Sequence, residues 1–267
     1  IKLAIGTAFT YAYEEQLYLV TNWHNVTGRE PGTLKAKNKD AGIPDRLSIR
    51  IPVIVEVLGE KKLDPRKLQV LEWREYTMLL YKDIGDCDPT KPVWYEHPQY
   101  GYQVDVVVAP ITFPEKVFIY PANDPKLNLS RVLLRPSLDV FVLGFPVGMS
   151  GGANLPVWKR GSIASEPDID VDNLPKILID TATRKGMSGA PVYLSKSGYF
   201  HSEEKYKTGE YKIHMGEARK FLGVYSGRIG EDNFLAQLGV VWKSTVIEEI
   251  IQGEKIGKSS FELCPSR

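Results

Sequence analysis

The sequence predicts an all-β protein that ends in a single helix. Runs of β-branched and aromatic residues recur along the 267 residues, and such runs are typical of short strands. The segments between them are rich in Gly, Pro, Asn and Asp, as turns are. About a dozen short strands with one helix are typical of two β-barrels or two β-sandwiches.

The first half of the chain holds the first group of expected strands. Two of them flank Glu14 and Glu15 and predict a β-hairpin. The expected strands lie at 5–13, 16–21, on both sides of Pro52, at 76–81 and at 104–111. The polar segment 121–130 is the best boundary, which predicts one domain at 1–121 and a second at 122–267.

The second half shows the same pattern and then a helix. We expect strands at 140–145, 158–165, 177–182, 190–194, 221–227 and 234–242. The charged stretch 201–220 is interpreted as a solvated loop or hairpin insertion. Ser244 is expected to cap a helix that carries Val246, Ile247, Ile250 and Ile251 on one face.

Charge and composition argue against several functions. The 34 basic and 33 acidic residues give a net charge of +1 without a block of like charges. This balance favours neither a nucleic acid nor an anionic membrane as partner. No run of 18 apolar residues predicts a membrane-spanning helix. His97, His201 and His214 lack metal-ligand spacing, so we expect no metal, and no motif predicts another cofactor.

The two cysteines, Cys87 and Cys264, are too few for the disulfide framework of small secreted proteins. Their pairing stays open at this stage, and the low cysteine content together with the absence of a signal peptide favours the cytoplasm. Because the chain begins with Ile1, we expect a processed product or an excised fragment.

Three local patterns carry potential chemistry. His24 follows a strand in LYLVTNWH, Asp105 opens the apolar run VDVVVAPI, and Ser188 lies between glycines in GMSGAPV. Acyl transfer needs a hydroxyl nucleophile, a base that takes its proton, and an acid that orients the base. Gly186 and Gly189 leave room for backbone N–H groups to converge on a developing oxyanion.

These motifs, with GTAFTY and FLGVYSG, resemble those of trypsin-like serine peptidases, in the same order, from Gly6 to about Ile251. The resemblance implies two six-stranded antiparallel β-barrels of the chymotrypsin type with a C-terminal α-helix. It also implies a bacterial endopeptidase that cleaves a protein or peptide substrate through an acyl-enzyme.

The resemblance further implies a role for each matching residue. His24 is the expected general base and later general acid, Asp105 holds its imidazole, and Ser188 is the nucleophile. The oxyanion would bind to the N–H groups of Gly186 and Ser188. The implied substrate-binding residues are Ala182, Thr183, Lys185, Ser226, Gly227 and Arg228.

Other residues compete for two of these roles. Ser150 also lies in a GMSG sequence, but only one expected strand of the second half precedes it, whereas three precede Ser188 and three follow it. A six-stranded second barrel of this family therefore favours Ser188. The alternatives to Asp105 are Asp83, Asp86, Asp88 and Asp139. Asp139 lies after the expected domain boundary, and the three acids at 83–88 lie in a turn-like segment without a following strand.

Met187 precedes the expected nucleophile, where digestive relatives place an aspartate that pairs with a freed N-terminus. A thioether cannot form that ion pair. We therefore expect a site that is either preformed or ordered by a regulatory partner or an upstream domain, with the loop 185–187 as a natural switch. The alternative function is a protease-fold binding module with vestigial catalysis. An esterase lacks support because Ser188 leads into a strand rather than a helix.

Overall fold

The computed structural model describes residues 2–58, 67–82, 91–129, 131–229 and 237–261. Both cysteines, and three of the alternative acids, lie outside the described residues: Asp83, Asp86, Asp88, Cys87 and Cys264.

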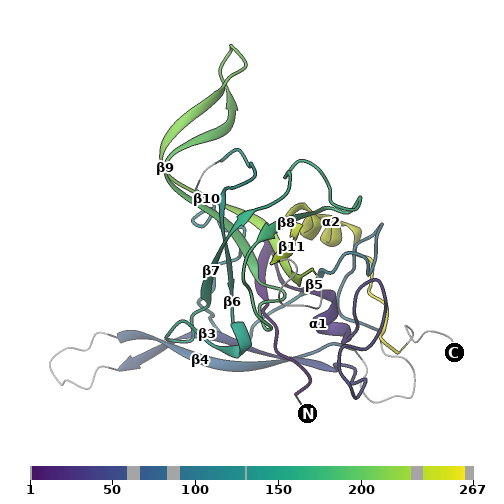
Figure 1. Ribbon diagram of the computed structural model, residues 1–267. Helices are drawn as coiled ribbons and strands as arrows, with labels where there is room; N and C mark the ends of the chain where they lie inside the picture. The colour runs from purple at the N-terminus through teal and green to yellow at the C-terminus, as the bar shows by residue number, and fades with distance from the viewer. Residues whose placement is uncertain (1, 59–66, 83–90, 130, 230–236, 262–267) are drawn as a thin grey trace.

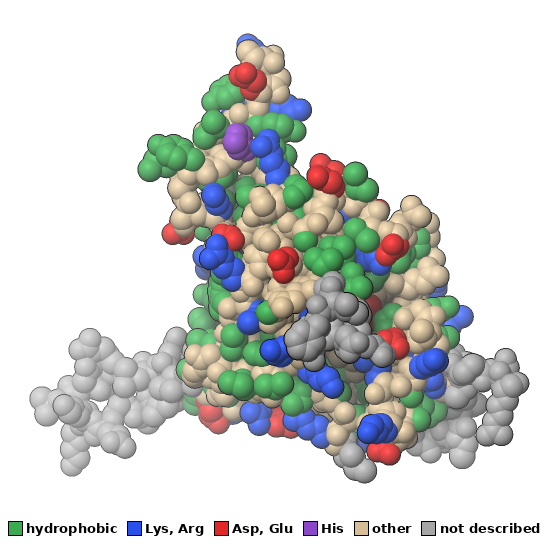
Figure 2. All heavy atoms as spheres, in the orientation of Figure 1, with side chains coloured by type: hydrophobic (Ala, Val, Ile, Leu, Met, Phe, Trp, Pro, Cys, Tyr) green, Lys and Arg blue, Asp and Glu red, His purple; other side chains and the backbone are tan. Residues whose placement is uncertain are grey.

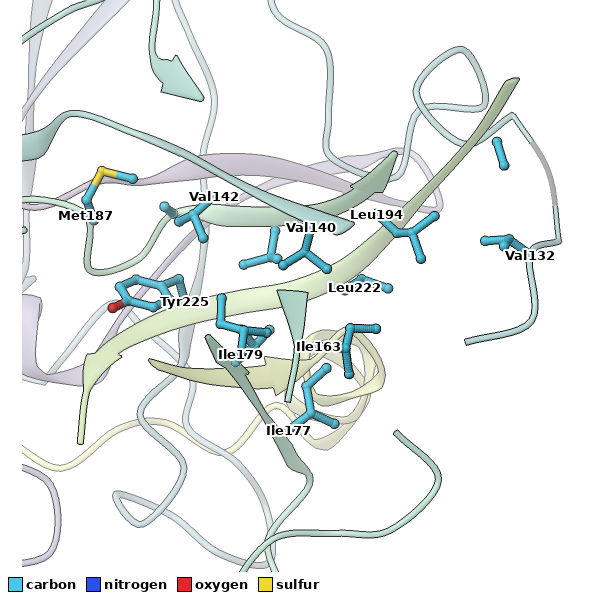
Figure 3. Close-up of a cluster of buried hydrophobic side chains, with 14 of the residues drawn as sticks. Val132, Val140, Val142, Ile163, Ile177, Ile179, Met187, Leu194, Leu222 and Tyr225 are labelled. Carbon is cyan, nitrogen blue, oxygen red and sulfur yellow. The ribbon is translucent and has the colours of Figure 1, made fainter. Parts of the chain in front are cut away.

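The second half of the chain forms a closed barrel of six antiparallel strands in the order β10-β11-β8-β7-β6-β9. Alternate side chains of the strands point inward, as a half-buried strand requires, and fill the core drawn in Figure 3. The six-stranded barrel predicted for this half is confirmed. The strands are β6 (Asp139–Gly144), β7 (Val157–Ile163), β8 (Lys176–Asp180), β9 (Pro191–Lys205), β10 (Tyr211–Arg228) and β11 (Leu238–Lys243).

The first half differs from the expected six-stranded barrel. Its described residues form a three-stranded sheet, in the order β1-β2-β5, and a separate two-stranded ribbon, β3-β4. The hairpin predicted at 5–13 and 16–21 is present as β1 and β2. The strands are β1 (Phe9–Tyr13), β2 (Gln16–Thr21), β3 (Arg46–Leu58), β4 (Lys67–Leu79) and β5 (Val107–Pro110).

Short bridging segments join the two sheets of the first half. The free edge of β3 pairs with residues 116–118, where the Phe118 N–H donates to the Pro52 carbonyl oxygen at 2.8 Å. A few residues later, the Ala122 N–H donates to the Thr10 carbonyl oxygen in β1 at 2.7 Å. In the described residues, isolated bridges therefore connect the two sheets in place of a continuous closed barrel.

Two helices and a short 3₁₀ turn complete the fold in the described part of the chain. α1 (Trp23–Thr27) follows β2, and the 3₁₀ turn η1 (Pro146–Gly148) follows β6. α2 (Thr245–Gly253) confirms the predicted C-terminal helix, and its four expected apolar residues are buried. Ser244 occupies the N-cap position without a side-chain capping bond. Among the described helices, none has the length and apolar character needed to cross a membrane.

Two long hairpins project from the body of the molecule (Figure 1). One is the β3-β4 ribbon, and the other is the outer part of β9 and β10, which contains the charged stretch 201–220. Figure 2 shows hydrophobic and charged side chains mixed on this second hairpin. Tyr199, Ile213 and Met215 are among its exposed apolar residues.

Candidate active site

His24 is positioned by α1, the single helical turn that follows β2. Trp23 fixes this turn, because its side chain is fully buried and its Nε1–H donates to Glu96 Oε1 at 2.8 Å. The turn ends at Gly28, whose φ of +69° is the left-handed conformation that glycine adopts most easily. His24 is thereby held in the interior, where only 7% of its surface is exposed.

Asp105 lies two residues before β5 and is buried beside His24. Its Oδ2 is 2.7 Å from Nδ1 of the imidazole, and its Oδ1 accepts the His24 backbone N–H at 3.0 Å. The Ser226 hydroxyl also donates to Oδ2. A buried carboxylate is costly unless it is satisfied, and these donors satisfy it. Because Asp105 occupies Nδ1, the imidazole keeps Nε2 for chemistry.

Ser188 lies in the tight loop between β8 and β9. Gly186 and Gly189 have φ values of +94° and +86°. A Cβ on Gly189 would lie 2.1 Å from the Thr7 carbonyl oxygen, so only glycine fits there. Met187 is fully buried and packs beside Val142 and Tyr225 at one end of the barrel core (Figure 3).

The buried Met187 changes our expectation for this loop. We expected the loop 185–187 to be a natural switch, because Met187 cannot form the ion pair of the digestive enzymes. The structure shows an apolar anchor instead, since the thioether is inserted into the barrel core next to the candidate nucleophile. The packing of the second barrel therefore holds the loop in place.

Ser226 connects the candidate nucleophile with the His24–Asp105 pair. Its hydroxyl donates to Asp105, and its carbonyl oxygen accepts the Ser188 Oγ–H at 3.2 Å. Within the described chain, the Ser188 hydroxyl makes no hydrogen bond to the imidazole. Catalytic hydrogen bonds are often loose in resting sites and tighten when substrate binds.

Two backbone donors beside Ser188 are unpaired. Neither the Gly186 N–H nor the Ser188 N–H has an acceptor among the residues that the structure describes. Gly186 is buried, and a buried N–H without a partner is rare enough to suggest a function. Unpaired backbone N–H groups next to a nucleophile are the kind of donor that an oxyanion-binding site uses.

The other predicted substrate residues are distributed around this loop. A Cβ on Gly227 would lie 4.0 Å from Ser188 Oγ, which brings the end of β10 close to the nucleophile. Arg228 is half-buried, whereas Ala182 and Lys185 are exposed.

The Thr183 hydroxyl, which we expected to face a substrate, is buried and hydrogen bonded to the Tyr225 hydroxyl. Burial raises the pKa of Tyr225, although the hydrogen bond from Thr183 and the charge of Arg228 oppose this shift.

The competing residues lie elsewhere. Ser150 is exposed in the loop between β6 and β7. Asp139, at the start of β6, forms an ion pair with Arg160 at 2.9 Å across the β6-β7 pair. In the described part of the chain, no group of three or more His, Cys, Asp or Glu residues could hold a metal ion.

Sequence reasoning missed the polar residues that support the site. Asn22 is fully buried, and its Nδ2 donates to the Asp105 carbonyl oxygen at 2.6 Å. Thr7 contacts the nucleophile loop through both its hydroxyl and its N–H. Asn22 adjoins WH and Thr7 lies in GTAF, but single residues of these types carry no signal that separates support from ordinary turns.

Comparison with known proteins finds only distant likeness. No protein-family model and no curated protein matches the chain. Among solved structures, the active form of the Rv3671c protease from M. tuberculosis is 17% identical, with a TM-score of 0.41, and the match covers 95% of this chain and 75% of that one. The HtrA-type protease AlgW with a tripeptide is 15% identical, with a TM-score of 0.40, over 94% of this chain and 59% of that one.

Proposed function

We propose that the protein is a serine endopeptidase that cleaves a protein or peptide substrate through an acyl-enzyme intermediate. The observation that carries this proposal is the connection through Ser226, which joins Ser188 to the buried His24–Asp105 pair. A structural histidine needs neither this carboxylate nor a serine loop with two unpaired N–H groups. The arrangement contains each group that acyl transfer requires.

In the proposed first step, Ser188 exchanges its hydrogen bond to Ser226 for one to His24 Nε2. The imidazole takes the hydroxyl proton as Oγ attacks the scissile carbonyl carbon. Asp105 stabilises the resulting imidazolium without taking the proton. The Gly186 and Ser188 N–H groups donate to the oxyanion that forms on the carbonyl oxygen.

The second part of the reaction reverses these roles. Protonated His24 gives its proton to the leaving amine, and the C–N bond breaks to leave an ester on Ser188. Water then loses a proton to His24 as it attacks the ester, and the returning proton releases Ser188 and the acid product. Ser226 and Gly227, at the end of β10, are proposed to lie along the substrate backbone.

Each half of the chain contributes to this mechanism. His24 and Asp105 belong to the proposed domain 1–121, and Ser188 belongs to the proposed domain 122–267. A regulatory partner or an upstream domain stays part of the proposal, although the buried Met187 favours a site that is preformed. Closure of the site then depends on contacts between the two halves.

Incubation with a peptide library tests this function. New peptide termini, identified by mass spectrometry, should appear with the wild type and with the Ser150→Ala control, and should disappear with Ser188→Ala and His24→Ala. Equal turnover of simple esters by all variants, without new termini, would reject the endopeptidase. Binding of peptides without cleavage would support the binding-module alternative.

A further inference from the structure

Thr7 contacts the nucleophile loop from the other half of the chain. It precedes β1 and is 4% exposed. Its Oγ1–H donates to the Gly186 carbonyl oxygen at 2.8 Å, and its backbone N–H donates to the Ser188 carbonyl oxygen, also at 2.8 Å. The two bonds lie on either side of Met187, so one threonine holds the backbone of the loop at two points.

Thr7 is itself fixed by neighbouring side chains. The Thr21 hydroxyl donates to the Thr7 carbonyl oxygen at 2.8 Å. Asn25 Nδ2 donates to Thr21 Oγ1 at 3.0 Å and to the Ser188 carbonyl oxygen at 3.3 Å. These residues come from β2 and α1, the elements that also position His24. The same structure therefore supports the base and the loop of the nucleophile.

The turn η1 also holds the nucleophile loop, on the other side of Gly186. The Val147 N–H donates to the Lys185 carbonyl oxygen at 2.7 Å. In a planar trans peptide, the C=O and N–H groups point in opposite directions. Holding the Lys185 carbonyl therefore aims the Gly186 N–H to the opposite side. The Thr7 hydroxyl also accepts the Phe145 N–H at 3.4 Å, which joins Thr7 to η1.

Both carbonyl groups that flank the Gly186 α-carbon are thus held, one by Val147 and one by Thr7. This matters because Gly186 has no side chain and φ of +94°, so its own conformational preference restricts it little. Without the Thr7 hydroxyl, the Gly186–Met187 peptide loses its partner and can rotate. The direction of the candidate oxyanion donors then varies.

We propose that Thr7 is a positioning residue that aims the Gly186 and Ser188 N–H groups at the developing oxyanion. This inference rests on the proposed function, because the N–H groups act on the acyl-transfer intermediate. Both of these Thr7 bonds go to backbone carbonyl groups of the nucleophile loop, so Thr7 acts through that loop. Its hydroxyl couples the first half of the chain to the reactivity of Ser188.

Fluorophosphonate labelling of Ser188 tests the role of the hydroxyl. Thr7→Val removes the hydroxyl but keeps the shape and the backbone N–H. We expect its maximal labelling rate to fall about tenfold, which is less than the loss when an oxyanion donor is itself removed. The half-saturating probe concentration and the midpoint of the pH profile should not change, because His24 and Asp105 are untouched.

Two variants separate positioning from a general loss of stability. Thr7→Ser keeps the hydroxyl and should restore the labelling rate. Thr10→Val is the matched control, because Thr10 lies in β1 and its hydroxyl makes no hydrogen bond in the described chain. Its labelling rate should equal that of the wild type. A Thr7→Val variant that labels like Thr10→Val, or a Thr7→Ser variant that fails to recover, would overturn the inference.

A measurement without labelling keeps this inference separate from the proposed function. Relaxation-dispersion NMR of glycine-labelled protein reports motion of the Gly186 amide. Thr7→Val should add exchange broadening at Gly186, and Thr10→Val and Thr7→Ser should not. If the wild type does not label, the proposed function fails, while unchanged Gly186 relaxation in Thr7→Val would reject the positioning role by itself.

Discussion

The two halves of the molecule hold their catalytic candidates in different ways. The second half closes six strands into a barrel, and Met187 inserts into its core beside Ser188. In its described residues, the first half forms two separate sheets joined by single bridges, and His24 and Asp105 lie on short segments outside the strands. Apolar packing of Met187 and hydrogen bonds from Thr7 hold the loop of Ser188. The His24–Asp105 pair depends on individual hydrogen bonds, although buried Trp23 anchors the turn that carries His24. Single polar substitutions should therefore be most damaging in the first half.

The largest expected effect comes from Asp105→Asn. The amide keeps the size of the side chain but no longer stabilises an imidazolium or selects the tautomer with Nε2 free. We expect a loss on the order of 10⁴-fold in the fluorophosphonate labelling rate, with thermal stability largely retained. Asp139→Asn, which breaks only an exposed ion pair with Arg160, is the control and should label normally. Equal effects of the two substitutions would reject the assignment of Asp105.

A matched pair of leucine truncations compares the packing of the halves. Leu194 is fully buried in the closed barrel, and Leu19 lies in β2 beside an open pocket of about 320 Å³. Leu194→Ala should cost about 3–5 kcal/mol in free energy of unfolding, because it opens a new void in a tight core. Leu19→Ala should cost about 2 kcal/mol, because its surroundings are already hollow.

Denaturant unfolding of both leucine variants measures the difference. A larger cost for Leu19→Ala would contradict the comparison, since it would place the better packed core in the first half. The midpoints of the unfolding curves are compared at equal slope, because the extrapolation of the free energy to water adds an uncertainty that the midpoints avoid.

Removal of the Asn22 amide should lower stability less than Leu194→Ala does, and it should also slow the reaction of Ser188. Asn22→Ala leaves the Asp105 carbonyl oxygen unpaired inside the protein, which should cost about 1–3 kcal/mol. Labelling should also slow, because Asp105 loses its support. Asn123→Ala breaks two bonds to the Ala12 backbone, far from the site, and provides the control. It should lower the melting temperature without slowing the labelling of the folded protein.

The smallest expected effect is an increase in stability. Val147 has a φ of +46° and a ψ of +27°, which is unfavourable for a β-branched residue. Val147→Gly relieves this strain and keeps the N–H that holds Lys185, so stability should rise by about 1 kcal/mol with labelling retained. Thermal unfolding measures the change, and a fall in stability would show that the side chain contributes more than the strain costs.

The structures of the two halves also differ in how well the sequence predicted them. The strands of the second barrel alternate in burial and could be read from their residues, as could the amphipathic α2. Three strands precede Ser188 and three follow it, as expected. The two separate sheets of the first half were not predicted, because strand patterns show where strands form but not whether a sheet closes.

The supporting residues were beyond reach for a different reason. Thr7 and Ser188 are separated by most of the chain, and their contact depends on how the halves meet. The loop 185–187 was expected to be a switch because a thioether cannot form the ion pair of the digestive enzymes. The burial of Met187 in the barrel supplies an apolar anchor that the residue type alone did not indicate.

The most direct test of the central claim is to map the site of a fluorophosphonate adduct. The wild type, Ser188→Ala and Ser150→Ala proteins are labelled under one condition and digested for mass spectrometry. The account predicts an adduct on Ser188 in the wild type and in Ser150→Ala, and none in Ser188→Ala. An adduct on Ser150, or a wild type that does not react, would contradict it.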